Sequence, residues 1–273
     1  MPMRYGILGP LLVSAGEAQH TPTAPKQRSL LALFLAQANR LVPADDIIAE
    51  LWPDRPPVSA AITVQTYVMQ LRARLTRAFT DGRAGREVLL TRPTGYLFKT
   101  EPGQLDVPDF ERAAAAGMAA LDLGDARGAA QQLRHAMSLW RGPALGDVRR
   151  GAQLDLHARR LDERRLHVEE LCVDVELQMG RHREVIGDLR ALVGRHPMHE
   201  GFHAKLMLAL SRANRRTDAL TVYRQLHEHL GAHARVEPSE AVRQLREAIA
   251  VDSPALGFGP SWSAAAARPR RAS

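Results

Sequence analysis

The residue pattern changes at about residue 105, and this change limits the possible folds more than any other feature of the chain. Before it, short apolar runs separated by Gly and Pro alternate with helical patterns. From residue 106 to residue 252 only helical periodicity is found. A chain of 273 residues has room for two ordinary domains. We therefore expect a mainly α protein with a small β component, divided into domains at 1–105 and 106–252.

The first domain is predicted to have the order strands, helix, helix, helix, hairpin. Two short strands flank the turn Gly9-Pro10, and Pro25 fits the first position of a helix, where its missing N–H is not needed. A second helix is predicted to start at Pro43. A hairpin is predicted around the turn Pro93–Gly95. A tight helix-turn-helix followed by a hairpin is a winged helix, whose third helix enters the major groove of DNA and whose hairpin is the wing.

The third helix, predicted over residues 59–76, has two different faces. Its apolar stripe is Val64, Val68, Leu71 and Leu75. The opposite face carries Ile62, Thr66, Met69, Gln70 and Ala73, and it contains no acidic residue. Gln pairs with adenine, and Arg pairs with guanine or with a phosphate. The residues expected to read bases are Thr63, Gln65, Thr66, Gln70, Arg72 and Arg74.

A second group of residues is expected to contact phosphates or to form the wing. The helix predicted from Pro25 offers free backbone N–H groups at its start, which favour anions. The side chain of Tyr67 has two open interpretations, a phosphate contact through its hydroxyl or packing at the edge of the core. The phosphate and wing group consists of Lys26, Gln27, Arg28, Tyr67, Thr91 and Arg92.

The net charge of +7 is distributed unevenly along the chain. Residues 1–105 carry +4, residues 106–252 are neutral, and residues 253–273 carry +3. A basic region is the electrostatic feature expected of a phosphate-binding domain. The neutral region is therefore better suited to protein contacts. The basic tail is expected to be disordered, and its removal is expected to lower DNA affinity without changing operator preference.

The second domain contains a local pattern that recurs. Gly180-Arg181 and Asn214-Arg215 are 34 residues apart, which is the period of tetratricopeptide helical hairpins. Gly124-Asp125 starts a third similar pattern, followed by about 22 extra residues before the next one. The residues at matching offsets are Ala129 and Leu133, Val185 and Leu189, and Ala219 and Tyr223. The pattern predicts an all-α, tetratricopeptide-like repeat domain.

Residues 199–203 match the zinc-protease motif H-E-x-x-H, but the surrounding residues argue against a zinc site. His199 and His203 match H-E-x-x-H, which needs both His on one helical face. Leu206 and Leu210 continue on the face of His203, which favours a packing role for this residue. Gly201 inside the motif also weakens a rigid metal-binding helix. We expect no metal, no cofactor and no enzyme activity.

The composition also bears on location. The longest apolar run near the start, Leu30–Ala36, has seven residues, whereas a membrane span needs about 20. The single cysteine, Cys172, cannot form an internal disulfide. We therefore expect a cytoplasmic, nucleoid-associated protein that makes no membrane contact.

Several short motifs carry a family resemblance when they are taken together. They are Ile7–Leu11, Pro25–Arg28, Leu51–Pro53, Pro56-Pro57, Val64–Val68, Leu71-Arg72, Arg92–Tyr96 and Trp140–Leu145. These motifs resemble those of the Streptomyces antibiotic regulatory proteins over roughly residues 3–250. The resemblance implies an OmpR-like winged helix followed by a bacterial transcriptional activator domain. The chain lacks a G-x-x-x-x-G-K-[ST] phosphate loop, and we expect the small, stand-alone type.

The resemblance also implies a function. Members of the family activate secondary-metabolite clusters by binding direct repeats near the −35 region, as protomers side by side, and by recruiting RNA polymerase holoenzyme. The implied polymerase contact loop includes Trp52, Asp54 and Arg55. The alternative is a helical-repeat scaffold whose winged helix binds protein rather than DNA. The acid-free outer face of residues 59–76 favours DNA.

Overall fold

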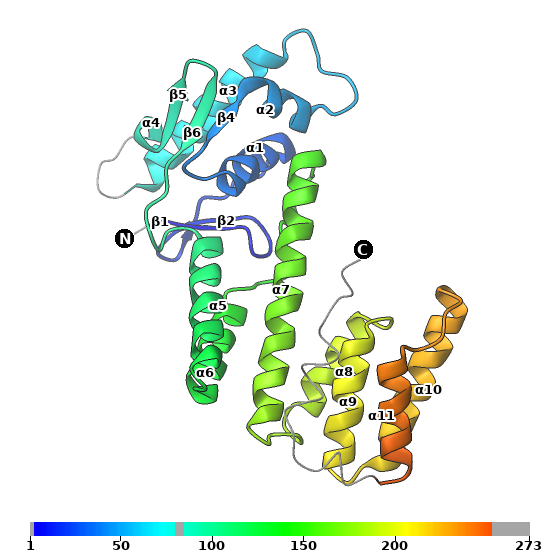
Figure 1. Ribbon diagram of the computed structural model, residues 1–273. Helices are drawn as coiled ribbons and strands as arrows, with labels where there is room; N and C mark the ends of the chain where they lie inside the picture. The colour runs from blue at the N-terminus through cyan, green and yellow to red at the C-terminus, as the bar shows by residue number, and fades with distance from the viewer. Residues whose placement is uncertain (1–2, 80–84, 253–273) are drawn as a thin grey trace. The chain divides into compact units, whose positions relative to one another are not determined.

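The computed structural model describes residues 3–79 and 85–252 and divides into two compact units (Figure 1). The first contains Met1–Ala119 and Gln131–Val168, and the second contains Ala120–Ala130 and the residues from Glu169 onward. The mainly helical fold class is confirmed. The predicted division at 105/106 lies inside the first unit, because the winged helix packs together with the helices that follow it. The tail expected to be disordered, 253–273, lies outside the described residues.

The N-terminal strands form a small antiparallel sheet in the order β1-β2-β3. They are β1 (Met3–Gly6), β2 (Leu12–Ala15) and β3 (Ala18–Gln19). The two strands predicted around Gly9-Pro10 are present, and Gly9 has a φ of 137°, which a turn residue with a side chain rarely adopts. The strand β3 was not predicted, because two residues contain no period.

The helix-turn-helix follows as α1 (Pro25–Ala36), β4 (Leu41–Pro43), α2 (Ala44–Leu51) and α3 (Ala60–Ala78). The predicted start of the second helix at Pro43 is wrong by one residue. Pro43 belongs to β4, where it lies opposite Gly95 of β6 (Gly95–Phe98). The strand β4 was missed because its partner lies about 50 residues away in the sequence, so no local pattern reveals the pairing.

The wing is the hairpin of β5 (Leu89–Arg92) and β6, and the sheet order is β4-β6-β5. A short helix, α4 (Gly85–Val88), precedes β5. The sheet packs on α1 through aromatic contacts: the ring of Phe34 lies 6.5 Å from that of Phe98 and 6.1 Å from that of Tyr96. These contacts place the wing at a defined position beside the helix-turn-helix.

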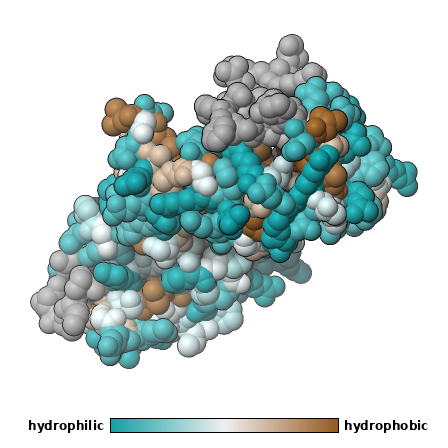
Figure 2. Space-filling view, turned by 90° about the horizontal axis from the view of Figure 1, so that it is seen from below, coloured by the Kyte–Doolittle hydropathy of each residue, from teal (hydrophilic) through white to brown (hydrophobic). Residues whose placement is uncertain are grey.

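Purely helical structure begins with α5 (Asp106–Asp122), α6 (Ala126–Ser138) and the long α7 (Ala152–Gln178). The second unit continues with α8 (Ile186–Arg195), α9 (Glu200–Arg212), α10 (Arg216–His233) and α11 (Glu240–Ala250). None of the helices in the described ranges is long and apolar enough to cross a membrane. The face shown in Figure 2 is mostly hydrophilic, with separate apolar patches.

Three helix ends in this region have the same hydrogen-bonded form. Gly124, Gly180 and Asn214 have φ values of 76°, 77° and 61°. The next residue in each case donates its N–H to the carbonyl five residues earlier, at 2.9, 3.0 and 2.8 Å. This is the Schellman arrangement of a helix C-terminus. The recurring sequence pattern therefore marks three equivalent turns between helices.

The repeat prediction is confirmed by burial as well as by the turns. The paired residues Ala129 and Leu133 of α6 are buried, as are Val185 and Leu189 around the start of α8. Ala219 is also buried, while Tyr223 is half-buried beneath the guanidinium of Arg246, which lies 5.4 Å from its ring. The extra residues after the first hairpin are the segment 139–151 and the added length of α7, which has 27 residues where the equivalent α9 has 13.

Candidate DNA-binding surface

The helix α3 presents two faces, as its sequence predicts. Val64, Val68, Leu71 and Leu75 are buried against α1 and α2. On the other side Gln65, Thr66 and Gln70 are exposed, while Thr63 and Arg74 are half-buried. The side chains with hydrogen-bonding capacity therefore lie in solvent, on a helix whose position is set by its apolar stripe.

The two threonines of this surface use their hydroxyl protons within the helix. Thr63 Oγ1 donates to the carbonyl of Ser59 at 2.9 Å, and Thr66 Oγ1 donates to the carbonyl of Ile62 at 3.0 Å. Their oxygens remain acceptors and their methyl groups remain apolar contacts. Neither threonine can therefore act as a hydrogen-bond donor without leaving this position.

One contact extends the surface from α3 to α1. The side-chain amide of Gln27 donates to the amide oxygen of Gln70. Gln27 lies in the first turn of α1, so the start of that helix lies beside the exposed face of α3. Of the three residues expected to contact phosphates at this helix start, Gln27 is the one that the structure places next to the base-reading candidates.

Arg72 does not match the expectation of a base-reading side chain. Its Nε donates to the carbonyl of Leu89 at 2.9 Å, and its Nη2 donates to the hydroxyl of Thr91 at 2.8 Å. The guanidinium therefore joins α3 to β5 and fixes the wing. No local pattern of residues predicts this role, because the contact between Arg72 and Leu89 depends on the path of the chain between them.

Lys26 and Arg28 also have partners within the protein. Lys26 Nζ donates to the carbonyl of Leu51 at 2.5 Å and lies 4.7 Å from the ring centre of Trp52. Burial, followed by the nearby charge of Arg149, lowers the pKa of Lys26. The ammonium of Lys26 therefore caps the C-terminal end of α2. Its expected phosphate contact stays a prediction.

Arg28 is directed to the helical region rather than outward. Its Nη1 donates to the carbonyl of Pro22 at 2.9 Å, and its Nη2 forms an ion pair with Asp147. Asp147 Oδ1 in turn accepts from the backbone N–H of Leu11 at 2.8 Å. Arg28 therefore connects the winged helix to the segment 139–151. Its expected phosphate contact stays a prediction.

The remaining candidates lie on the wing and in the loop after α2. Arg92 and Thr91 are exposed near the tip of the hairpin, whereas Tyr67 is half-buried. Within the described ranges, no carboxylate forms an ion pair with Arg74 or Arg92. In the loop, Asp54 and Arg55 are exposed and Trp52 is half-buried beneath Lys26.

The carboxylates of three residues join the winged helix to α5, to the non-helical segment 139–151 and to the start of α7, and sequence reasoning missed all three roles. Glu50 is buried on α2 and accepts from the N–H groups of Gly151 at 2.6 Å and Gln153 at 2.9 Å. Asp147 accepts from Leu11, as described above. Glu50 and the helix start that it caps are about 100 residues apart, so no local sequence pattern predicts their contact.

Asp106 is the third of these carboxylates. It accepts from the N–H groups of Ile7 and Leu8 at 3.0 Å and from Nη2 of Arg141 at 3.0 Å. Burial raises its pKa, and these hydrogen bonds oppose that rise. A Cβ at Gly6 would meet Arg141 Nη2 at 2.1 Å, so a side chain there would displace the guanidinium from its present position.

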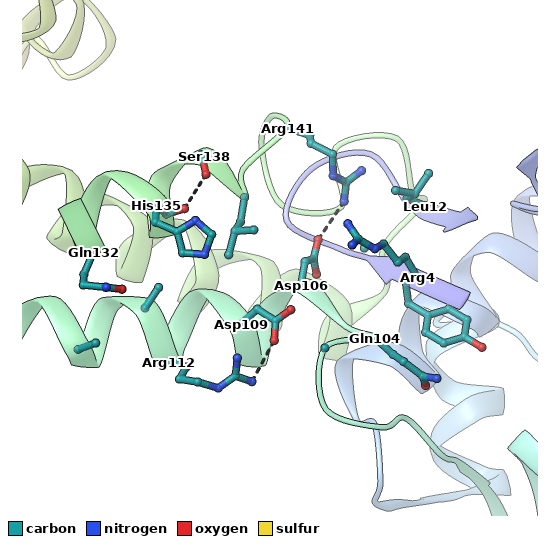
Figure 3. A pocket seen from close by; sticks show the side chains of 16 residues that line it. Arg4, Leu12, Gln104, Asp106, Asp109, Arg112, Gln132, His135, Ser138 and Arg141 are labelled. Carbon is teal, nitrogen blue, oxygen red and sulfur yellow. Dashed lines mark hydrogen bonds and ion pairs between the residues drawn. The ribbon is translucent and has the colours of Figure 1, made fainter. Parts of the chain in front are cut away.

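A cleft of about 620 Å³ lies beside Asp106 and is lined by β1, α5 and the end of α6 (Figure 3). Two of its three arginines are paired with carboxylates: Arg141 with Asp106, and Arg112 with Asp109 at 2.9 Å. Because the charges in this cleft are largely paired, it does not resemble the unpaired basic surface around α3.

The H-E-x-x-H letters do not form a metal-binding helix. His199 precedes α9 as its N-cap, and its Nδ1 accepts from the N–H of Phe202 at 3.3 Å. His203 lies inside the helix and is 1% exposed. The two imidazoles therefore do not share one helical face, and no cluster of three metal-binding side chains is found in the described ranges.

Comparisons with known proteins agree with this arrangement. Residues 18–98 match the family "Transcriptional regulatory protein, C terminal", and residues 105–250 match the bacterial transcriptional activator domain. Regulatory protein DnrI of Streptomyces peucetius is 38% identical over 267 residues, which cover 97% of this chain and 98% of DnrI. The chain belongs to the Streptomyces antibiotic regulatory protein family. It is a transcriptional regulator.

The resemblance extends to longer regulators. The structure of Mycobacterium tuberculosis EmbR in complex with a low affinity phosphopeptide superposes with a TM-score of 0.86 at 31% identity, covering 97% of this chain and 69% of that chain. Regulatory protein AfsR of Streptomyces griseus is 32% identical over 90% of this chain, which spans 24% of AfsR. This antibiotic regulatory protein therefore has the winged-helix and activator arrangement that the larger regulators also contain.

Proposed function

We propose that this regulator activates the genes of a secondary-metabolite cluster by placing α3 in the major groove of promoter DNA. The observation that carries the proposal is the exposed face of α3, where Gln65, Thr66 and Gln70 lie free of acidic neighbours on their own helix. Glutamine offers a donor and an acceptor that match the adenine edge in the major groove.

The neighbouring groups support the same orientation. Arg74 on α3 and the exposed Arg92 on the wing add positive charge for phosphate contacts. Gln27 lies beside Gln70 and completes the surface at the start of α1. Arg72 acts indirectly in this proposal, since it fixes Thr91 and the wing.

Activation in this proposal uses two further surfaces. Two protomers bind side by side on direct repeats about one helical turn apart, near the −35 region, by analogy with the family. The exposed Asp54 and Arg55 and the neutral helical region then contact RNA polymerase holoenzyme and the neighbouring protomer. The protein acts in the cytoplasm on the nucleoid, without cofactor, metal or catalytic step.

A mobility-shift assay with the promoters next to the gene tests the proposal. The wild-type protein is expected to shift a direct-repeat promoter and not a scrambled one. The triple variant Gln65→Ala, Thr66→Ala, Gln70→Ala is expected to lose this preference while keeping weak, salt-sensitive binding. Gln131→Ala, an exposed change on α6, is the control and is expected to bind as the wild type does. An unchanged preference in the triple variant contradicts the assignment of α3.

A further inference from the structure

Two large apolar side chains lie in solvent on the face of α3 that is proposed to meet DNA. Ile62 is 67% exposed and Met69 is 62% exposed. Since neither is buried, neither contributes appreciably to the folded core. Folding therefore does not explain why two large apolar side chains lie on this polar, acid-free surface, and contact with a binding partner would explain it.

Helical geometry puts these residues on one line. Successive residues turn by about 100°, so Ile62, Thr66, Met69 and Ala73 fall within a sector of about 60°. Thr66 belongs to this line through its methyl group, because its hydroxyl is bonded to the Ile62 carbonyl. We call these four residues the methyl ridge.

The two glutamines flank the methyl ridge on opposite sides. Counting about 100° per residue from Ile62, Gln65 lies about 60° to one side and Gln70 about 80° to the other. The apolar groups are thus at the centre of the surface, and the adenine-reading candidates are at its edges. A groove that receives this helix meets the ridge first.

The chemistry of the major groove supplies one apolar partner. The C5-methyl of thymine is the only apolar group that base pairs display there. The charge of this helix favours a polyanion, because α3 carries arginines and no acidic residue. Ile62 and Met69 are seven residues apart, about 10.5 Å along the helix, which corresponds to about three base-pair steps of about 3.4 Å.

We propose that Ile62 and Met69 determine specificity by contacting the C5-methyl groups of two operator thymines about three base pairs apart. The inference rests on the proposed DNA-binding function of α3. The inference also predicts what the two glutamines bind. The adenine paired with each thymine shows its N6 and N7 in the same groove, so the glutamines are expected to bind these adenines. The ridge and its flanks together select A·T pairs.

The test uses DNA that lacks only the methyl group. Each thymine of a footprinted operator is replaced in turn by deoxyuridine, and dissociation constants are measured by fluorescence anisotropy. The full-length wild-type protein is expected to lose about three- to fivefold in affinity at two positions about three base pairs apart. Ile62→Ala is expected to abolish the deoxyuridine effect at one of these positions, and Met69→Ala at the other.

The controls separate this inference from folding and from the proposed function. Leu156→Ala changes an exposed leucine of α7 and is expected to show both deoxyuridine effects unchanged. Circular dichroism checks that the two α3 variants remain folded. Sequence-specific binding that is insensitive to every deoxyuridine overturns the methyl ridge and leaves the proposed function intact. Deoxyuridine effects that persist in both α3 variants also overturn it. Absence of any sequence-specific binding contradicts the proposed function itself.

Discussion

At the scale of single residues, neighbours decide what an arginine does. Arg72 and Arg74 are two positions apart on α3, yet Arg72 is bonded to Leu89 and Thr91 while no acidic partner is found for Arg74 in the described ranges. Arg28 likewise pairs with Asp147. A basic residue near a DNA-binding helix is therefore as able to support the scaffold as to contact a phosphate.

Replacement of Arg72 by Ala is expected to weaken the wing. The buried carbonyl of Leu89 loses its side-chain donor, which costs about 1–3 kcal/mol of unfolding free energy. Urea unfolding measures this loss, with Arg77→Ala as the control because Arg77 Nε donates to the carbonyl of Ala73 within its own helix. Equal stability of the two variants would contradict the bridging role.

Histidine burial predicts a dependence of stability on pH. Burial is the main cause that lowers the pKa of His203, which lies near His199, Glu200 and His229. The unfolded imidazole has a pKa of about 6.5. Below that pH the unfolded chain gains a proton before the folded protein does, so stability is complete above about pH 6.5 and falls as the pH decreases toward the folded pKa.

Urea unfolding between pH 7.5 and pH 5.5 measures this effect. His203→Gln is expected to make the dependence of the unfolding free energy on pH shallower, because glutamine does not titrate. His135→Gln, a change at an exposed position of α6, is the control. A slope that is the same in His203→Gln and in the wild type refutes the contribution of His203.

At the scale of elements, specific hydrogen bonds define where several helices begin and end. Three helices end with the same hydrogen-bond pattern at Gly124, Gly180 and Asn214. The local sequence around each of these residues predicts the turn. The start of α7 is different, because the carboxylate of Glu50 on α2 accepts from its first N–H groups. That start is capped by a residue from a distant part of the chain.

Glu50→Ala is expected to destabilise the first compact unit. It leaves the N–H groups of Gly151, Gln153 and Leu154 without this acceptor, at a cost of about 2–3 kcal/mol. Thermal unfolding followed by circular dichroism measures the change. Asp45→Ala on the exposed side of α2 is the comparison and is expected to cost less than about 1 kcal/mol. Similar losses in the two variants argue against a cap at α7.

At the scale of the whole molecule, the winged helix is continuous with its helical neighbour. Glu50, Asp106 and Asp147 each accept hydrogen bonds that join residues 1–105 to the segments that follow, Asp106 from the backbone N–H groups of Ile7 and Leu8. The backbone carbonyl of Leu8 also accepts from the N–H of Arg141 at 2.8 Å. Both parts lie in one compact unit, so α3 belongs to a unit larger than the winged helix alone.

A fragment of residues 1–105 is therefore expected to be less stable than the full chain. It exposes Leu8, which is buried in the intact protein, and it removes the partners of Glu50. The fluorescence of Trp52 reports unfolding in urea, and a fragment of residues 1–168 is expected to unfold at a higher urea concentration. If residues 1–105 unfold at the same midpoint as the full chain, the winged helix is independent.

The sequence by itself determined the fold class, the order of the three helices and the wing hairpin, the apolar stripe of α3 and the repeat turns. These features depend on residues within a few turns of one another, where period and turn chemistry are visible. The acid-free face of α3 was predictable for the same reason, since one helix contains all of it.

Only the tertiary structure decided which charged residues remain available. Lys26, Arg28 and Arg72 were assigned to DNA from their types and positions, and each is bonded to a distant part of the chain. The strand β4 and the cap by Glu50 depend on distant partners in the same way. A hydrogen bond between residues 50 or 100 positions apart depends on the folded path of the chain, which no local pattern of residues contains.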